Sequence, residues 1–174
     1  MFYNVLMKKW LKFIVLVIVI AGIYCLSLYF KKDIIVGENK SEDLYKVVYV
    51  SDGDTVILAM NNEEVYVRLI GIDCPESKHP DESKNTQEGV KAAEYTRNLL
   101  ENKWVYFEPG ENTTTDKYGR TLGYLYLEDG TFVNLKIVQD GYAYVMTMEN
   151  DQYADLFIEA YEEAVKENRG LWAQ

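Results

Sequence analysis

Residues 44–72 read LYKVVYVSDGDTVILAMNNEEVYVRLIGI, and this stretch decides the fold. β-Branched and aromatic residues dominate Leu44–Val50, Thr55–Met60 and Glu64–Ile72, and polar residues typical of turns separate these runs. Such runs predict consecutive strands, and the Asn61-Asn62 turn predicts that the second and third strands form an antiparallel hairpin. We therefore expect the folded domain to begin with a sheet near Leu44.

Further strands and a helix follow this stretch. Residues 103–108 and 121–127 have the composition of two more strands. Between the third and fourth strands, Asn85 and Glu88 have the spacing of a capping box, which predicts a helix that reaches about Asn102.

The C-terminal part of the chain predicts two more helices. A short helix is expected from Val133 to Gln139, with Gly141 after its end. The last helix should end at Gly170, because apolar residues before it recur at helical spacing: Tyr153, Leu156, Phe157, Ala160, Tyr161 and Ala164. Five strands and three helices in this order predict an α+β fold, a closed five-stranded barrel of the OB type with helices packed outside.

Length and composition limit the classes of protein that are possible. The 174 residues have room for one ordinary globular domain, and the formal net charge is −10. Residues 1–32 hold five of the 18 basic residues and no acidic residue, so the remainder carries a net charge of −15. Two Cys exclude a disulfide framework, and one His excludes a zinc site of Cys and His ligands.

The N-terminal segment has the features of a targeting sequence. Residues 13–30, FIVLVIVIAGIYCLSLYF, are 18 residues without a charge, and Lys residues flank them on both sides. As a helix they would span about 27 Å, close to the hydrocarbon core of a bilayer. We expect a basic region over 1–12, a transmembrane anchor or cleaved signal over 13–30, a linker over 31–43 and a folded domain over 44–174. Both alternatives for 13–30 predict a domain outside the cytoplasm.

Two groups of carboxylates border the predicted strands. Asp52 and Asp54 lie in the turn before the second strand, and Asp73 and Glu76 follow the third strand. Because an antiparallel hairpin returns the third strand beside the second, we expect all four carboxylates to converge. Crowded like charges are costly unless a cation is present, and oxygen ligands without His or thiolate select Ca²⁺ or Mg²⁺. The alternatives are an ordinary hairpin turn and a solvated acidic loop.

Two arginines accompany these carboxylates. Arg68 precedes Asp73 on the same strand, and Arg120 precedes the fifth strand. The planar guanidinium matches phosphate oxygens, although an arginine on a half-buried strand is more often an ion-pair partner. A hard-metal site combined with two arginines is the chemistry of phosphoryl transfer, in which Glu76 can orient or deprotonate a water molecule.

At these residues the chain resembles the staphylococcal nuclease (thermonuclease) family, which are calcium-dependent secreted phosphodiesterases with an OB-fold barrel and three helices. The resemblance covers about residues 44–172. Four motifs carry it in the family's order and approximate spacing: Val50–Thr55 (VSDGDT), Val67–Glu76 (VRLIGIDCPE), Asp116–Arg120 (DKYGR) and Gly170–Trp172 (GLW).

The resemblance implies a calcium site and a base. Asp54 and Asp73 would bind Ca²⁺ through their carboxylates, and Asp52 would act through a metal-bound water. Cys74, where the family commonly has Thr, would contribute its main-chain carbonyl. Glu76 would be the general base, or would at least position the attacking water.

The resemblance also implies how the substrate is held. Arg68 would hold the scissile phosphate, Arg120 would stabilise the transition state and leaving group, and Lys117 and Tyr118 would contact the terminal phosphate. The implied reaction is hydrolysis of the 5′-oxygen–phosphorus bond of DNA and RNA, which leaves 3′-phosphate ends. We expect single-stranded substrates, and no protein partner is implied.

Two features depart from the family. Thr147 stands where the family's nucleotide pocket has a Tyr, which leaves Tyr144 as a candidate substitute. The acidic domain should repel nucleic acid, so we expect weak binding and strong dependence on a divalent ion. Cys74 as a nucleophile is a further reading, but it lacks a His partner.

The alternative function is a catalytically silent OB-fold module that binds nucleic acid or protein at the cell surface. Such a module has no physical need for the combination of Arg68, Glu76, Arg120 and three aspartates, so the sequence favours the nuclease.

Overall fold

The computed structural model describes residues 17, 20–22, 43–111, 114–147 and 151–173. Two units divide the chain, Met1–Gly37 and Glu38–Gln174. The described residues of the first unit are helical and exposed. The remainder of the predicted membrane segment, and nearly all of the predicted linker, lie outside the described residues. In the part of the chain that is described, no helix combines the length and apolarity needed to cross a membrane.

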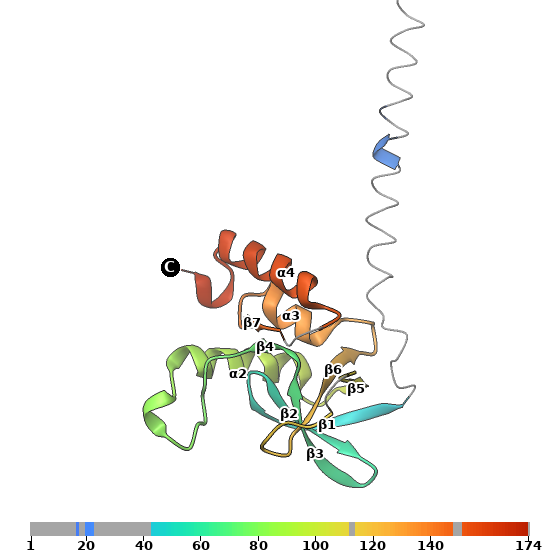
Figure 1. The fold of residues 1–174 in the computed structure, drawn as a ribbon, viewed down its shortest axis with the longest axis vertical. Helices are drawn as coiled ribbons and strands as arrows, with labels where there is room; N and C mark the ends of the chain where they lie inside the picture. Colours follow the sequence, from blue (N-terminus) through green and yellow to red (C-terminus); the bar gives the residue numbers. More distant parts are fainter. Residues whose placement is uncertain (1–16, 18–19, 23–42, 112–113, 148–150, 174) are drawn as a thin grey trace, which may run out of the picture. The chain divides into compact units, whose positions relative to one another are not determined.

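The second unit is built on a closed barrel with the strand order β1-β2-β3-β6-β5 (Figure 1). Its strands are β1 (Leu44–Asp52), β2 (Thr55–Met60), β3 (Glu63–Leu69), β5 (Trp104–Pro109) and β6 (Thr121–Leu127). The pair β3–β6 is parallel and the other neighbours are antiparallel. The predicted α+β fold with a five-stranded barrel is confirmed.

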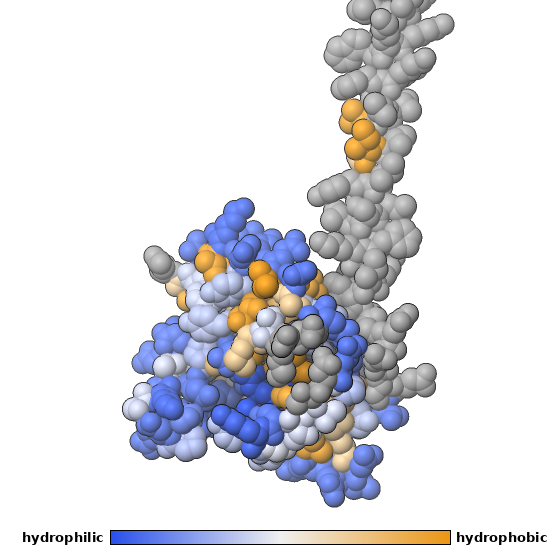
Figure 2. All heavy atoms as spheres, viewed as in Figure 1, coloured by the Kyte–Doolittle hydropathy of each residue, from blue (hydrophilic) through white to orange (hydrophobic). Residues whose placement is uncertain are grey.

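Apolar side chains fill the barrel and the space under the helices. Val56, Leu58, Val67 and Leu125 are each fully buried. On the face shown in Figure 2, hydrophilic residues cover most of this unit, and apolar side chains appear only in small patches. Burial of β-branched and aliphatic residues is the main stabilising contribution to this packing.

The predicted third strand is divided in two. β3 ends at Leu69, and Gly71–Asp73 forms β4, which pairs with β7 (Tyr144–Met146) in a separate two-stranded sheet. The division occurs because Gly71 has a φ of +84°, and a Cβ there would lie 2.1 Å from a ring carbon of Phe157. A single strand over Glu64–Ile72 was therefore wrong, and the short strand β7 was not predicted.

Three helices pack outside the barrel, as predicted. They are α2 (Gln87–Leu100), α3 (Val133–Gln139) and α4 (Ala154–Lys166), with short 3₁₀ turns η1 (Glu82–Lys84) and η2 (Gly170–Trp172). In Figure 1, α2 lies along β1, whereas α3 and α4 pack on each other near the β4–β7 sheet.

The helix ends differ in detail from the sequence patterns. Thr86 caps α2, because its hydroxyl accepts from the Gly89 N–H at 3.0 Å, so Asn85 is not the cap. Asn168, with a φ of 55°, follows the end of α4, so Gly170 does not end that helix. Gly141, with a φ of +80°, follows α3 as predicted.

Candidate functional site

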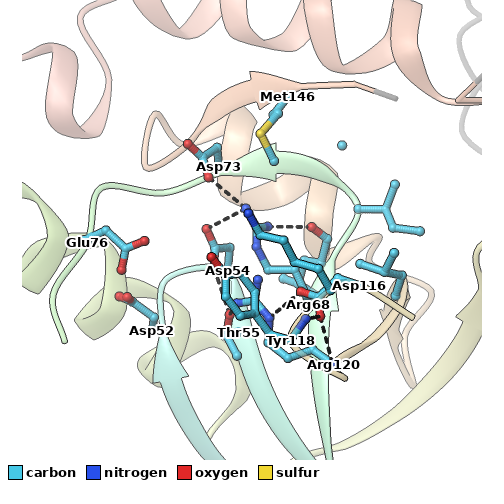
Figure 3. Close-up of a pocket in the computed structure, with 15 residues that line it drawn as sticks. Asp52, Asp54, Thr55, Arg68, Asp73, Glu76, Asp116, Tyr118, Arg120 and Met146 are labelled. Carbon is cyan, nitrogen blue, oxygen red and sulfur yellow. Dashed lines mark hydrogen bonds and ion pairs between the residues drawn. The ribbon is translucent and has the colours of Figure 1, made fainter. Parts of the chain in front are cut away.

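An open pocket of about 470 Å³ lies at one end of the barrel (Figure 3). Its walls come from the β1–β2 turn, from the end of β3 with β4 and the loop after it, and from the loop before β6. Every predicted site residue except Cys74 lines it: Asp52, Asp54, Arg68, Asp73, Glu76, Lys117, Tyr118 and Arg120. Segments far apart in the sequence therefore form one site.

The strand pairings explain why these segments meet. Thr55 pairs with Arg68 across the antiparallel β2–β3 ladder, and Leu122 pairs with Arg68 across the parallel β3–β6 ladder. The start of β2, the end of β3 and the start of β6 thus lie side by side. Side chains just before or after these strand ends project into the same pocket.

The turn that carries Asp52 and Asp54 is held from behind by α2. The Thr96 hydroxyl donates to the Gly53 carbonyl at 2.7 Å. A Cβ at Gly53 would lie 2.7 Å from the Cβ of Cys74, so no larger residue fits without displacement. This turn is therefore fixed by contacts with α2 and Cys74, whereas the sequence had left open an ordinary hairpin turn.

Asp54 is a buried carboxylate at the floor of the pocket, and it is 7 % exposed. It accepts hydrogen bonds from the Thr55 hydroxyl at 3.0 Å and from the Cys74 N–H at 2.8 Å. A guanidinium nitrogen of Arg68 lies 3.3 Å from its Oδ2. Burial raises the pKa of Asp54, and Arg68 only partly opposes this shift. Further positive charge at this point would therefore stabilise the ionised carboxylate.

The Arg68 guanidinium is held by main-chain carbonyls and by carboxylates of the pocket. Its Nη1 donates to the carbonyls of Leu69 at 2.8 Å and Ile72 at 2.7 Å, and its Nη2 donates to Asp73 Oδ1 at 2.8 Å. The guanidinium thus joins the end of β3 to β4 and lies between Asp54 and Asp73 (Figure 3). The ion-pair role that the sequence left open is present, and the phosphate contact stays a prediction.

Glu76 and Asp52 lie together at one end of the pocket in Figure 3. Partial burial raises the pKa of Glu76, and the charge and hydrogen bond of Asp52 raise it further. Asp52 is itself held by Ser77, whose hydroxyl donates to Asp52 Oδ1 at 2.7 Å. A carboxylate whose pKa is shifted toward neutrality suits proton transfer at physiological pH.

Arg120 and Tyr118 lie at the other end of the pocket in the same view. The Nε of Arg120 donates to Asp116 Oδ2 at 2.7 Å, and its Nη1 donates to the Thr55 hydroxyl at 3.2 Å. The Tyr118 ring lies 5.5 Å from the guanidinium and 5.0 Å from the Lys117 ammonium. Arg120 is oriented by its neighbours and remains part of the pocket wall.

Asp116 lines the pocket and contacts Arg120, although the sequence predicted no role for it. Its Oδ1 accepts from the main-chain N–H groups of Tyr118 and Arg120, each at 2.9 Å. Burial opposes ionisation, but the hydrogen bonds from Arg120 and Tyr118 leave the pKa of Asp116 below its usual value. The sequence signal for this role is the spacing: Asp116 lies four residues before Arg120 in the same loop, where its carboxylate can orient the arginine.

The donor set suits a hard divalent ion, but the carboxylates do not form a tight cluster. They line one pocket, as expected, and supply only oxygen. Within the described ranges, no three His, Cys, Asp or Glu side chains are grouped closely enough to hold a metal ion. Burial raises the pKa of the Asp54 carboxyl and Arg68 only partly opposes this, so a cation beside Asp54 would favour its ionised form, and this is the observation that fits a cation there.

The structure also bears on two further sequence hypotheses, Cys74 as a nucleophile and Tyr144 as a pocket residue. The Cys74 thiol is buried, and burial raises its pKa well above the usual value, so the protonated form prevails and nucleophilic attack is disfavoured. The Tyr144 ring packs against Trp172 at 5.1 Å and Tyr161 at 6.4 Å and does not line the pocket. Met146 lines the pocket instead, so Tyr144 does not replace the missing tyrosine.

Comparisons with known proteins cover most of the folded unit. Residues 66–174 match the sequence model of the family described as staphylococcal nuclease homologue. The thermonuclease of Staphylococcus intermedius is 37 % identical over 129 residues, 74 % of this chain and 75 % of the relative. The thermonuclease of Staphylococcus hyicus is 32 % identical over 164 residues, 91 % of this chain and 95 % of the relative. An uncharacterized endonuclease of Escherichia coli O157:H7 is 33 % identical over 131 residues, 74 % of this chain and 76 % of the relative.

Proposed function

Because this chain belongs to the staphylococcal nuclease family, we propose that its pocket hydrolyses phosphodiester bonds of single-stranded DNA and RNA with Ca²⁺ as cofactor. Family membership makes the chain a nuclease that acts on nucleic acid. The observation that carries the finer proposal is the placement of Glu76 and Arg120 at opposite ends of one pocket, with Asp54 between them.

Four residues are candidates to hold the ion. Asp54 and Asp73 would contribute carboxylate oxygens, Cys74 its main-chain carbonyl, and Asp52 a contact through water. When bound, the ion supplies positive charge that polarises a phosphate oxygen. Burial raises the pKa of Asp54, and a bound cation would favour its ionised form, which supports a cation at this place.

Glu76 is the proposed base. Its carboxylate takes a proton from the attacking water, or orients that water, as a bond forms between the water oxygen and phosphorus. The bond between phosphorus and the 5′-oxygen breaks, and that oxygen takes up a proton from solvent. The products are a 3′-phosphate and a 5′-hydroxyl. The raised pKa of Glu76 brings its proton affinity closer to neutrality, which favours this role.

The two arginines neutralise charge on the phosphate. Arg120 is held by Asp116 and Thr55 and is proposed to stabilise the charge that develops in the transition state. Arg68 would contact the scissile phosphate, and Lys117 and Tyr118 the terminal phosphate. Residues 33–174 carry a net charge of −15, which should repel nucleic acid. We expect these local contacts to offset that repulsion.

The direct test is an assay of the full-length chain on denatured DNA and on RNA. We expect cleavage with Ca²⁺, none with excess chelator, and 3′-phosphate ends that block primer extension until a phosphatase removes them. Cleavage that persists in chelator would contradict the calcium role. A folded chain that binds but never cleaves nucleic acid would favour the silent binding module.

We also propose that the nuclease domain acts outside the cytoplasm. The support is the uncharged segment 13–30 between lysines. A C-terminal tag on the full-length chain should be accessible to protease added to intact cells, or appear in the medium. A tag protected from protease until the cells are lysed would contradict this location.

A further inference from the structure

Three residues outside the pocket form a small basic cluster, which we define as Tyr49, Lys78 and Arg97. Tyr49 lies on β1, Lys78 in the loop after Glu76, and Arg97 on α2. The Lys78 ammonium donates to the Tyr49 hydroxyl and lies 4.8 Å from the centre of its ring. The Tyr49 side chain is 44 % exposed, and Lys78 is exposed beside it.

Both cations act on the same phenol. The hydrogen bond and charge of Lys78 lower the pKa of Tyr49, and the charge and hydrogen bond of Arg97 lower it further. Two cations that share one neutral group repel each other, and an anion placed between them removes that cost. The basic cluster therefore has the electrostatics of an anion site.

Neither cation of the basic cluster is held by an ion pair of the kind that fixes the arginines of the pocket. Residues 33–174 contain 13 basic and 28 acidic residues, yet no carboxylate of the described residues forms an ion pair with Lys78 or Arg97. Arg68, Arg120, Lys136 and Arg169, in contrast, all have carboxylate partners. Tyr49 and Arg97 line one small hollow, which Glu101 also lines without an ion pair to Arg97. Lys78 and Arg97 are therefore available to an external anion at Tyr49.

The loop that carries Lys78 is fixed to the pocket. Ser77 holds Asp52 at 2.7 Å, and the Thr86 N–H donates to the Glu76 carbonyl at 2.9 Å. The His79 N–H donates to Asn85 Oδ1 at 2.6 Å. These contacts hold Lys78 next to the Glu76 end of the pocket, and Tyr49 lies three residues before Asp52 on β1.

We propose that Tyr49, Lys78 and Arg97 bind a backbone phosphate of the nucleic-acid strand where it leaves the Glu76 end of the pocket. This inference rests on the proposed function and extends it to a second phosphate site. The two cations neutralise the phosphate, and the Tyr49 hydroxyl can donate to a phosphate oxygen. A long strand reaches both the pocket and the basic cluster, whereas a dinucleotide occupies the pocket alone.

The test compares substrates of two lengths on the full-length chain. The substrates are a dinucleotide and a single-stranded DNA 20-mer, and the variants are Lys78→Gln, Arg97→Gln and the double substitution. Lys166→Gln removes the same charge from an exposed position on α4 and is the matched control. Thermal unfolding curves verify that each variant is folded.

We expect the double variant to lower the ratio of kcat/KM for the 20-mer to that for the dinucleotide by about tenfold, the effect of a lost charge-assisted phosphate contact. Lys166→Gln should leave the ratio unchanged. If the ratio stays constant in the double variant, or falls as much in the control, the basic cluster is not a phosphate site.

A binding measurement separates this inference from the proposed function. Affinity for the 20-mer is measured against salt concentration in excess chelator, where no turnover is expected. Loss of the one phosphate that the two cations neutralise should reduce the slope of log affinity against log salt by about 0.7, which needs no catalysis. An unchanged slope overturns the inference even if the enzyme is active, and a reduced slope supports it even if no cleavage is found.

Discussion

Two buried carboxylates of this barrel, Asp54 and Glu108, are satisfied in different ways. Asp54 is 7 % exposed, opens onto the pocket and shares a guanidinium with Asp73. Glu108 is 1 % exposed, and neutral side chains surround it: the hydroxyls of Tyr126 at 2.9 Å and Tyr153 at 3.3 Å, and the amide of Gln152 at 2.8 Å.

The difference separates a site from a scaffold. The donors to Glu108 come from β6 and from the segment before α4, so this carboxylate ties that segment to β5. Asp54 lines the pocket, and burial raises its pKa. A buried carboxylate closed in by donors stabilises the fold, whereas one that borders a pocket and whose pKa is raised by burial is available to a ligand.

The largest effect should come from Glu76→Gln, which tests the pocket side of the comparison. We expect kcat to fall by about 10²–10⁴-fold, the usual contribution of a general base, with the melting temperature nearly unchanged. In the unaltered chain the rate should fall as the pH drops through the raised pKa of Glu76, above the range of an ordinary glutamate, since only the ionised carboxylate accepts a proton. Steady-state kinetics from pH 4 to 9 measure both; an unchanged kcat in the variant refutes the role.

Glu108→Ala tests the scaffold side. It removes the acceptor of the Tyr153 hydroxyl and of the Gln152 amide, and it opens a cavity. We therefore expect the free energy of unfolding to fall by about 2–4 kcal/mol. Urea denaturation followed by tryptophan fluorescence measures it. Glu128→Ala, at an exposed glutamate after β6, is the control and should change stability by less than about 0.5 kcal/mol. Equal losses in the two variants would mean that the buried network contributes nothing.

Asp116→Asn should have an intermediate effect on catalysis, because Asp116 acts through Arg120. The amide keeps an acceptor for the main-chain N–H groups but loses the carboxylate oxygen that receives the Arg120 Nε–H. We expect kcat to fall about tenfold, less than for Arg120→Ala, where about 10²–10³-fold is expected. If the double variant is no worse than Arg120→Ala alone, Asp116 acts only by positioning; additive losses would contradict that.

The smallest expected effect is a pH-dependent difference in stability between the unaltered chain and Asp54→Asn. Because burial raises the pKa of Asp54, the folded state holds that proton more tightly than the unfolded state does. The unaltered chain should therefore lose stability relative to Asp54→Asn as pH rises from the ordinary Asp range through this raised pKa. Urea denaturation in chelator at several pH values measures it.

A control for that prediction is Asp129→Asn. Hydrogen bonds from Thr131 lower the pKa of Asp129, so its contribution to stability is present above the ordinary Asp range and is lost as pH falls through the lowered pKa. This variant should thus become less stable than the unaltered chain toward neutral pH. Parallel pH dependence of the two variants would show that neither reports its own carboxyl group.

Local sequence determined the elements and the ingredients of the site. The runs at residues 44–60 form the strands that their composition predicts. The pairing of the hairpin follows from the Asn61-Asn62 turn, in which both residues have positive φ. The helical spacing before Ala164 likewise predicts α4. Short-range steric and hydrophobic preferences suffice for these features.

Tertiary structure decided how those ingredients are used. The break at Gly71 depends on the Phe157 ring from a distant helix, and the Thr86 cap leaves Asn85 free to bind the His79 loop. The contacts of Asp54 with Arg68 and Cys74 likewise join segments that become neighbours only when the barrel closes. The same holds for the contact of Arg120 with Thr55. A hydrogen bond or ion pair between such groups depends on distances of a few ångströms across the fold, and one-dimensional spacing carries no record of those distances.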